Sequence, residues 1–159
     1  MVPKYRPNVA AIILRADHRI FVGERLKVAD AWQFPQGGVD NGEDLIAALR
    51  REVEEELGLA SKFIEIAECR TGYRYKFPKG HRKFGNWRGQ EQTYFLCKFK
   101  GMDNCIDLDA HDREFSRFQW ILPEEFQLSW LPEFKKKVYR QVFRDFFQID
   151  LKKQSNGDS

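Results

Sequence analysis

Apolar residues recur along this chain with two different periods. Short apolar runs bounded by turn-forming residues predict strands at Val9–Leu14, Ile20–Arg25, Trp32–Phe34, Phe63–Arg70, Tyr73–Phe77, Gln90–Phe99 and Phe118–Ile121. The glycines at 37, 38 and 42 predict a loop after the third run. The first part of the chain is therefore expected to form most of a sheet.

Two stretches follow helical periodicity instead. From Asp44 to Leu57 the apolar residues fall on one helical face, and Gly58 predicts the end of that helix. Pro132 opens a second amphipathic stretch, whose apolar residues recur every four positions at Phe134, Val138, Val142 and Phe146. Strands interrupted by one helix and followed by another predict an α/β (α+β) fold, a sandwich of helices around a mixed sheet.

Length and composition narrow the class of protein. A chain of 159 residues favours one domain, which we place at residues 1–151. The polar segment 152–159 is expected to be a disordered tail. The apolar share of 42% and charged share of 32% are typical of a globular protein, and the net charge of +3 is too small to identify a polyanionic partner.

Cysteine usage and hydropathy indicate the compartment. The 3 cysteines are an odd number, and none forms a C-x-x-C pair, which argues against a disulfide framework and a thiolate zinc site. A reducing cytoplasm fits this pattern. The apolar run Val9–Leu14 is too short to span a membrane and lacks the layout of a signal peptide.

The first predicted helix carries a cluster of glutamates. At 100° per residue, Glu55 lies about 60° to one side of Glu52 and Glu56 about 40° to the other, all within roughly 6 Å along the axis. Glu54 points to the opposite side. The three carboxylates therefore share one edge, next to the buried face.

Such an edge has two interpretations. Converging carboxylates are hard ligands that suit Mg²⁺ or Mn²⁺, and two or more ions would balance three glutamates. These ions bridge phosphate oxygens and lower the pKa of an attacking water. The alternative is a solvated acidic face, because like-charge pairs at this spacing cost only about 0.2–0.5 kcal/mol each.

The spacing around the glutamates decides between them. The segment from Gly37 to Leu59 satisfies every position of one spaced pattern. The pattern is Gly, five residues, Glu, seven residues, Arg-Glu, aliphatic, any residue, Glu-Glu, any residue, Gly, aliphatic. A chance match is on the order of 10⁻⁸ per start. The segment resembles the Nudix box, which implies an α/β/α sandwich and hydrolysis of a nucleoside diphosphate linked to another group.

The resemblance implies roles for individual residues of the box. It makes Glu52, Glu55 and Glu56 metal ligands, Glu55 being also catalytic. It adds the carbonyl oxygen of Gly37 to the ligands, and it places Arg51 in the catalytic set through a supporting ion pair with Glu43.

Motifs outside the box resemble a narrower group, the bacterial RNA pyrophosphohydrolases. They extend from Tyr5 to about Phe147 and include Tyr5–Val9, Trp32–Gly38, Tyr75–Pro78, Gly89–Gln92, Glu114-Phe115 and Phe134–Arg140. The resemblance implies that Glu114 is a further metal ligand or the general base. It also implies substrate-binding positions at Arg6, Arg25, Gln36, Tyr75, Lys76, Phe134 and Lys135. Related dinucleoside polyphosphate hydrolases share these motifs.

The segment from Arg70 to Arg88 points to nucleic acid independently of the resemblance. It holds seven basic residues, no acidic residue and five interleaved aromatics. Positive charges neutralise phosphates, while aromatic faces stack on unpaired bases. The alternative is a solvated basic edge with part of the aromatic set in the core. Trp32 is likewise open to base stacking or core packing, and the three histidines are interpreted as surface or turn residues.

The sequence-based hypothesis is an RNA 5′-pyrophosphohydrolase. It would convert 5′-triphosphate RNA to 5′-monophosphate RNA with release of pyrophosphate, thereby promoting RNA decay. The alternative enzyme is a hydrolase of dinucleoside polyphosphates such as Ap4A, and the alternative of another class is a non-catalytic module that binds nucleotides or RNA. The oligomeric state is left open.

Overall fold

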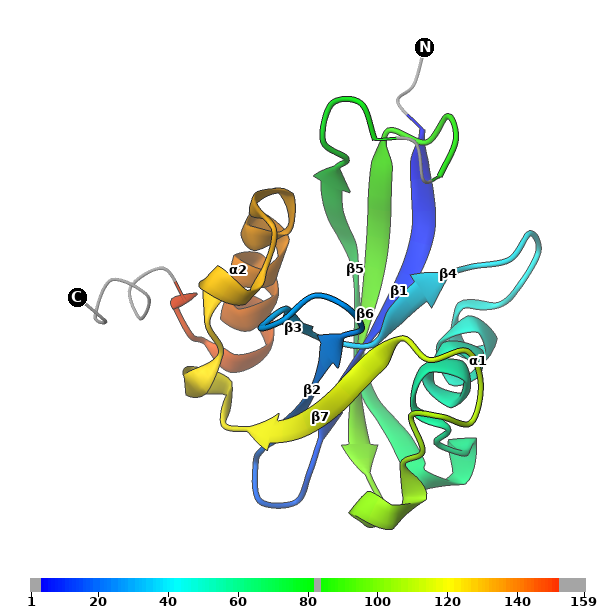
Figure 1. The fold of residues 1–159 in the computed structure, drawn as a ribbon, viewed down its shortest axis with the longest axis vertical. Coiled ribbons are helices and arrows are strands. Elements are labelled where there is room, and N and C mark those ends of the chain that lie inside the picture. The colour runs from blue at the N-terminus through cyan, green and yellow to red at the C-terminus, as the bar shows by residue number, and fades with distance from the viewer. Residues whose placement is uncertain (1–3, 82–83, 152–159) are drawn as a thin grey trace.

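The computed structural model describes residues 4–81 and 84–151, in which a mixed sheet lies between two helices (Figure 1). The expected tail at 152–159 and two basic residues of the Arg70–Arg88 segment, Arg82 and Lys83, lie outside the described residues. This arrangement confirms the predicted fold class.

The sheet has seven strands in the order β3-β2-β1-β6-β5, with β4 paired to β1 and β7 to β2. Their bounds are β1 Tyr5–Leu14, β2 Ile20–Arg25, β3 Trp32–Gln33, β4 Gln36–Gly38, β5 Ile64–Lys76, β6 Gly89–Phe99 and β7 Phe115–Ile121. β1 and β6 run parallel, and the other pairs are antiparallel. The sheet is therefore mixed, as expected.

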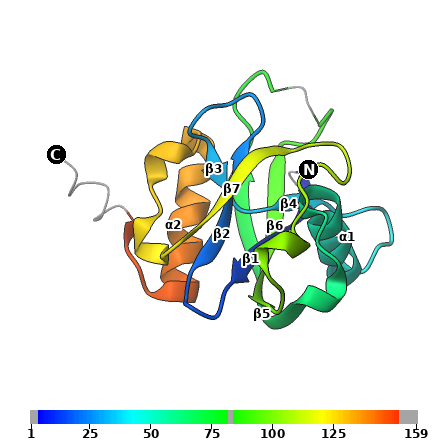
Figure 2. The same cartoon turned by 60° about the horizontal axis from the view of Figure 1, so that its bottom comes forward.

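Each face of the sheet is covered by one helix, and β1 contributes to both cores. Ala10 and Ile12 of β1 pack in the core beneath α2 (Glu133–Phe147), whereas Val9, Ala11 and Ile13 pack beneath α1 (Leu45–Leu57). Successive residues of a strand point to opposite faces, so a strand covered on both sides is apolar throughout. Figure 2 shows the sheet between the two helices.

Helix α1 has defined ends that fix the position of its glutamates. The carboxylate of Asp44 accepts hydrogen bonds from the backbone N–H groups of Ile46 and Ala47 at 3.1 and 3.2 Å. Gly58 ends the helix at φ 62°, a conformation that glycine adopts without strain. Contrary to the predicted apolar face, Leu45 and Ile46 in the first turn of α1 are exposed.

Several strand boundaries differ from the sequence-based expectation; β7, for example, begins at Phe115 and not at Phe118. The two strands predicted on either side of Gly72 are one strand, β5, with a register shift between Arg70 and Tyr73. The expected loop at residues 37–38 belongs to β4, which pairs with Asn8–Ala10 of β1. β1 itself begins at Tyr5 because its parallel pairing with β6 starts there.

All three cysteines, Cys69, Cys97 and Cys105, are free thiols. Within residues 4–81 and 84–151, no helix combines the length and apolar character needed to cross a bilayer.

Candidate active site

Glu52 lies directly against β4. A Cβ atom at Gly37 would come within 1.9 Å of the Glu52 carboxyl carbon, so only glycine leaves room for this side chain. The carboxylate is 14% exposed, and burial raises its pKa, with the nearby charge of Glu55 acting in the same direction. The Gly37 backbone and the Glu52 carboxylate therefore lie side by side.

Glu56 is the most deeply buried of these glutamates, with 8% of its surface exposed. Its Oε2 accepts a hydrogen bond of 3.3 Å from the backbone N–H of Gln36. Burial raises its pKa well above the usual value, and the charges of Glu52 and Glu114 raise it further. A buried carboxylate among like charges is stabilised when a cation binds beside it.

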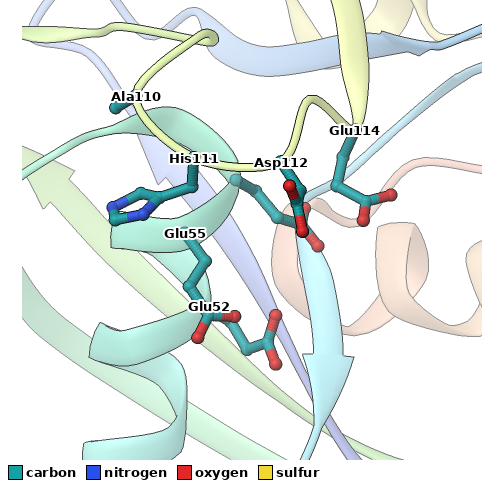
Figure 3. A pocket seen from close by; sticks show the side chains of 7 residues that line it. Glu52, Glu55, Ala110, His111, Asp112 and Glu114 are labelled. Carbon is teal, nitrogen blue, oxygen red and sulfur yellow. The ribbon is translucent and has the colours of Figure 1, made fainter.

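Glu55 and Glu114 complete an acidic cluster on a cavity of about 530 Å³. Glu55 comes from α1, and its side chain is 48% exposed. Glu114 comes from the loop before β7, which crosses over α1, so carboxylates far apart in sequence face one cavity (Figure 3). Glu54 does not line this cavity, in agreement with its predicted direction.

Arg51 holds the cluster from the side. Its guanidinium donates two hydrogen bonds to Glu43, at 2.8 and 2.9 Å, and one to the carbonyl oxygen of Gly38 at 2.9 Å. It also donates to Glu52 at 2.8 Å and lies 3.4 Å from Glu55. The hydrogen bonds from Arg51, together with one from the Asp40 N–H, lower the pKa of Glu43 to about 2. Arg51 is not among the residues that line the acidic cavity, and its hydrogen bonds orient the carboxylates of Glu43 and Glu52.

The acidic cluster fits a divalent cation in its chemistry. Across the described residues, 4–81 and 84–151, no group of three or more histidine, cysteine or acidic side chains has the arrangement needed to hold a metal ion. The carboxylates of Glu52 and Glu55 turn toward Arg51 instead. Five carboxylates nevertheless line one cavity beside the imidazole of His111, namely Glu52, Glu55, Glu56, Asp112 and Glu114. Of these, Glu56 is buried and accepts a hydrogen bond from the Gln36 N–H. Such donor sets favour Mg²⁺ or Mn²⁺ over softer metals.

A second cavity of about 590 Å³ adjoins the cluster and shares Glu52, Glu55, Glu56 and Glu114. Its volume is typical of a small-ligand site. It brings together most of the predicted substrate-binding residues: Arg6, Arg25, Gln36, Tyr75, Phe134 and Lys135. Lys76 is not among its lining residues, because it follows Tyr75 on β5 and points to the other face.

A buried network of amides supports Arg6 at the cavity floor. The Oε1 atom of Gln90 accepts hydrogen bonds from Arg6 at 2.7 Å and from Asn8 at 2.9 Å, while its Nε2 donates to the Tyr75 hydroxyl. The Nε2 of Gln92 donates to Asn8 at 2.9 Å and to Gln36 at 2.8 Å. Buried polar networks of this kind restrict side-chain rotation when their hydrogen bonds are satisfied.

Aromatic residues form another wall of this cavity. The rings of Tyr75 and Phe134 lie 5.5 Å apart, and Phe77 stacks on His81 at 4.4 Å. The Arg6 guanidinium lies 4.3 Å above the Phe84 ring. By contrast, Tyr73 and Trp32 are buried in the core beneath α2, which resolves the two open interpretations of Trp32 in favour of core packing.

Sequence reasoning missed several residues of the site. His81 and His111, interpreted as surface residues, line the two cavities. The sequence motifs that contain Gln90 and Asn8 assigned no role to either residue. A signal was present in the alternation of glutamines at 90 and 92, because polar residues at the buried positions of a strand need hydrogen-bond partners.

The chain is similar in sequence to proteins of one known family. The chain matches the NUDIX domain over residues 4–142. It is 44% identical over 149 residues to a protein named RNA pyrophosphohydrolase from Novosphingobium aromaticivorans, covering 89% of this chain and 92% of that one. A protein of the same name from Helicobacter pylori is 44% identical over 149 residues, covering 90% and 94%.

A solved structure supports the fold. The structure of an Ap4A hydrolase from C. elegans superimposes with a TM-score of 0.64 at 19% identity, covering 91% of this chain and 99% of that one. At this identity the likeness concerns the fold alone.

Proposed function

Because this chain belongs to the NUDIX family, we propose that it hydrolyses the 5′-triphosphate of RNA to a 5′-monophosphate with release of pyrophosphate. The observation that carries the proposal is the acidic cluster beside a cavity with basic and aromatic walls. The names of relatives 44% identical over nearly the whole chain support the RNA substrate.

The residues that would hold a divalent cation, proposed as Mg²⁺ with Mn²⁺ as a substitute, are Glu52, Glu55 and Glu56. The Gly37 carbonyl and Glu114 are the further candidate ligands. When bound, two or more such cations would neutralise phosphate oxygens and lower the pKa of the attacking water. Arg51 keeps two of the three helix glutamates oriented before the cation binds.

Hydrolysis requires one water molecule and one proton acceptor. The water oxygen forms a bond to one phosphorus of the anhydride, the bridging P–O bond breaks, and pyrophosphate leaves. Glu114 faces the acidic cluster from a separate loop. We therefore assign it the role of general base, which accepts the proton of the attacking water. A general base must reach that water by a hydrogen bond, which a carboxylate on the opposite wall of the cavity is placed to do.

The basic residues of the second cavity orient the substrate. Arg6 is held by Gln90 and stacks on Phe84, which fixes its guanidinium where it can receive phosphate oxygens. Arg25 and Lys135 line the same space. Phe134, next to Tyr75, offers an aromatic face to a base near the RNA 5′ end.

We further propose that the protein acts in the cytoplasm and promotes RNA decay. The free thiols fit a reducing compartment. A single domain over residues 1–151 agrees with the extent of the family match.

A paired substrate assay tests this function. Purified protein with Mg²⁺ should release pyrophosphate from triphosphorylated RNA with a higher kcat/KM than it shows for diadenosine tetraphosphate. Glu55→Gln should lose most of this activity. Glu54→Gln, on the opposite side of the same helix, is the matched control and should keep it. A strong preference for the dinucleotide would replace the RNA assignment with dinucleoside polyphosphate hydrolysis, and tight RNA binding without turnover would indicate a binding module.

Phe134→Ala is expected to raise the KM for triphosphorylated RNA about tenfold with little change in kcat. Base stacking on an aromatic ring contributes about 1–3 kcal/mol, and 1.4 kcal/mol corresponds to a factor of ten. Steady-state kinetics on a short RNA measure the change. Phe134→Tyr keeps an aromatic face and should restore the KM. Equal KM values for all three proteins would remove Phe134 from the binding site.

A further inference from the structure

A buried carboxylate outside the acidic cluster connects two segments of the cavity wall. Glu24, at the end of β2, is 7% exposed. Its carboxylate accepts hydrogen bonds from the backbone N–H of Asp30 at 2.8 Å, the Ser116 hydroxyl at 3.0 Å and the Arg117 guanidinium at 2.8 Å. One side chain therefore joins the loop after β2 to the first residues of β7.

The pairing of β2 with β7 is irregular at this point. Glu24 pairs with Arg117 and Arg25 pairs with Phe115, so Ser116 is an extra residue on β7. A β-bulge bends its strand and redirects the neighbouring side chains. Glu114 lies two residues before Ser116 on the same segment, so a change in the bulge would also reach Glu114.

The loop after β2 is held in an unusual conformation. Lys27 and Asp30 adopt positive φ angles of 68° and 60°, which residues other than glycine rarely take. Conformations of this kind persist only where surrounding contacts enforce them. The Glu24 bond to the Asp30 N–H is one such contact. The same loop touches the site directly, because the backbone N–H of Leu26 donates to the carbonyl oxygen of Glu114 at 2.9 Å.

We propose that Glu24 is a positioning residue for hydrolysis: by holding the Ser116 bulge and the Leu26–Asp30 loop, it sets the direction of Glu114 and the shape of the adjacent cavity wall. Arg25, Leu26 and Lys27 form that wall. The inference rests on the proposed role of Glu114 in the reaction.

A double-mutant cycle tests whether Glu24 acts through Glu114. Glu24→Ala should lower kcat about tenfold, as the loss of a supporting residue commonly does. Glu24→Gln keeps one acceptor oxygen, whereas the Asp30 N–H and the Ser116 hydroxyl use two different oxygens of Glu24, so it should recover only part of the rate. In the Glu114→Gln background, Glu24→Ala should lower the residual rate less than twofold. Equal losses in both backgrounds would overturn the proposal.

Asp17→Ala provides the matched control. Like Glu24, Asp17 is a carboxylate paired with arginine, here Arg15 at 2.7 Å and Arg19 at 3.0 Å, but it lies in the turn at the other end of β2. Its removal should change thermal stability without changing kcat. If Asp17→Ala and Glu24→Ala lowered kcat equally, Glu24 would have only a general structural role.

Hydrogen exchange gives a readout that does not require turnover. Glu24→Ala should speed exchange at the Leu26 amide, which is bonded to Glu114, whereas Asp17→Ala should leave it unchanged. Unchanged exchange in Glu24→Ala would contradict the proposal. The kinetic cycle is measured on whichever substrate, RNA or dinucleotide, the wild-type protein hydrolyses faster, so failure of the RNA assignment is distinguished from failure of the Glu24 inference.

Discussion

Replacing Glu56 by glutamine is expected to lower the hydrolysis rate by about 10²–10³-fold and, at the same time, to stabilise the metal-free protein. Glutamine keeps an acceptor for the Gln36 N–H but removes the charge that a cation would neutralise. It also removes a buried negative charge that the charges of Glu52 and Glu114 oppose. Removing a buried charge that lacks a compensating partner raises the free energy of unfolding by about 1–3 kcal/mol.

The pH dependence of stability follows from the direction of the Glu56 pKa. Burial raises this pKa in the folded, metal-free protein above its value in the unfolded chain. Between the two pKa values the folded state binds more protons than the unfolded state, so the free energy of unfolding decreases as the pH rises. The Glu56 contribution is complete below the unfolded pKa and is lost as the pH rises through the folded pKa.

Thermal unfolding in a chelator, measured across this pH range, checks the prediction. Wild-type protein should lose stability with rising pH more steeply than Glu56→Gln, and added Mg²⁺ should stabilise the wild type more than the variant. Glu54→Gln, whose side chain is exposed, should match the wild type in both respects. A Glu56→Gln protein with full activity would exclude Glu56 from the metal site.

Gly37→Ala is expected to lower activity by about 100-fold with a small effect on stability. The added methyl group would collide with the Glu52 carboxylate, at 1.9 Å from its carbon. That carboxylate is the end of a flexible side chain, so it can rotate away at little cost to the fold. A displacement of about 1 Å in a catalytic site can reduce the rate by about 100-fold.

Calorimetric titration of Mg²⁺ together with steady-state kinetics measures this effect. The affinity for Mg²⁺ should decrease in parallel with kcat, while the thermal midpoint stays close to that of the wild type. Gly101→Ala is the matched control, since its methyl group would meet Cys105 and Phe63 at 3.1 Å, away from the site. If Gly37→Ala bound Mg²⁺ and hydrolysed substrate normally, neither metal binding nor hydrolysis would depend on the position of the Glu52 carboxylate against Gly37.

Periodicity and spacing in the sequence determined the class of fold and the chemistry of the acidic edge. A helix has a regular angular repeat, so the placement of Glu52, Glu55 and Glu56 on one edge and of Glu54 on another follows from their numbers alone. The continuous apolar run of β1 likewise requires a cover on both faces of the sheet. These properties are local, and the tertiary structure agrees with them.

Only the tertiary structure decided which distant residues meet that edge. The parallel pairing of β1 with β6 brings Arg6 beside Gln90, and the crossing of the loop before β7 brings Glu114 to α1. Neither contact has a period or spacing in the sequence, because it arises from how strands pair and how the chain returns across the sheet. The same reason applies to Glu24, whose partners Ser116 and Arg117 lie more than ninety positions away.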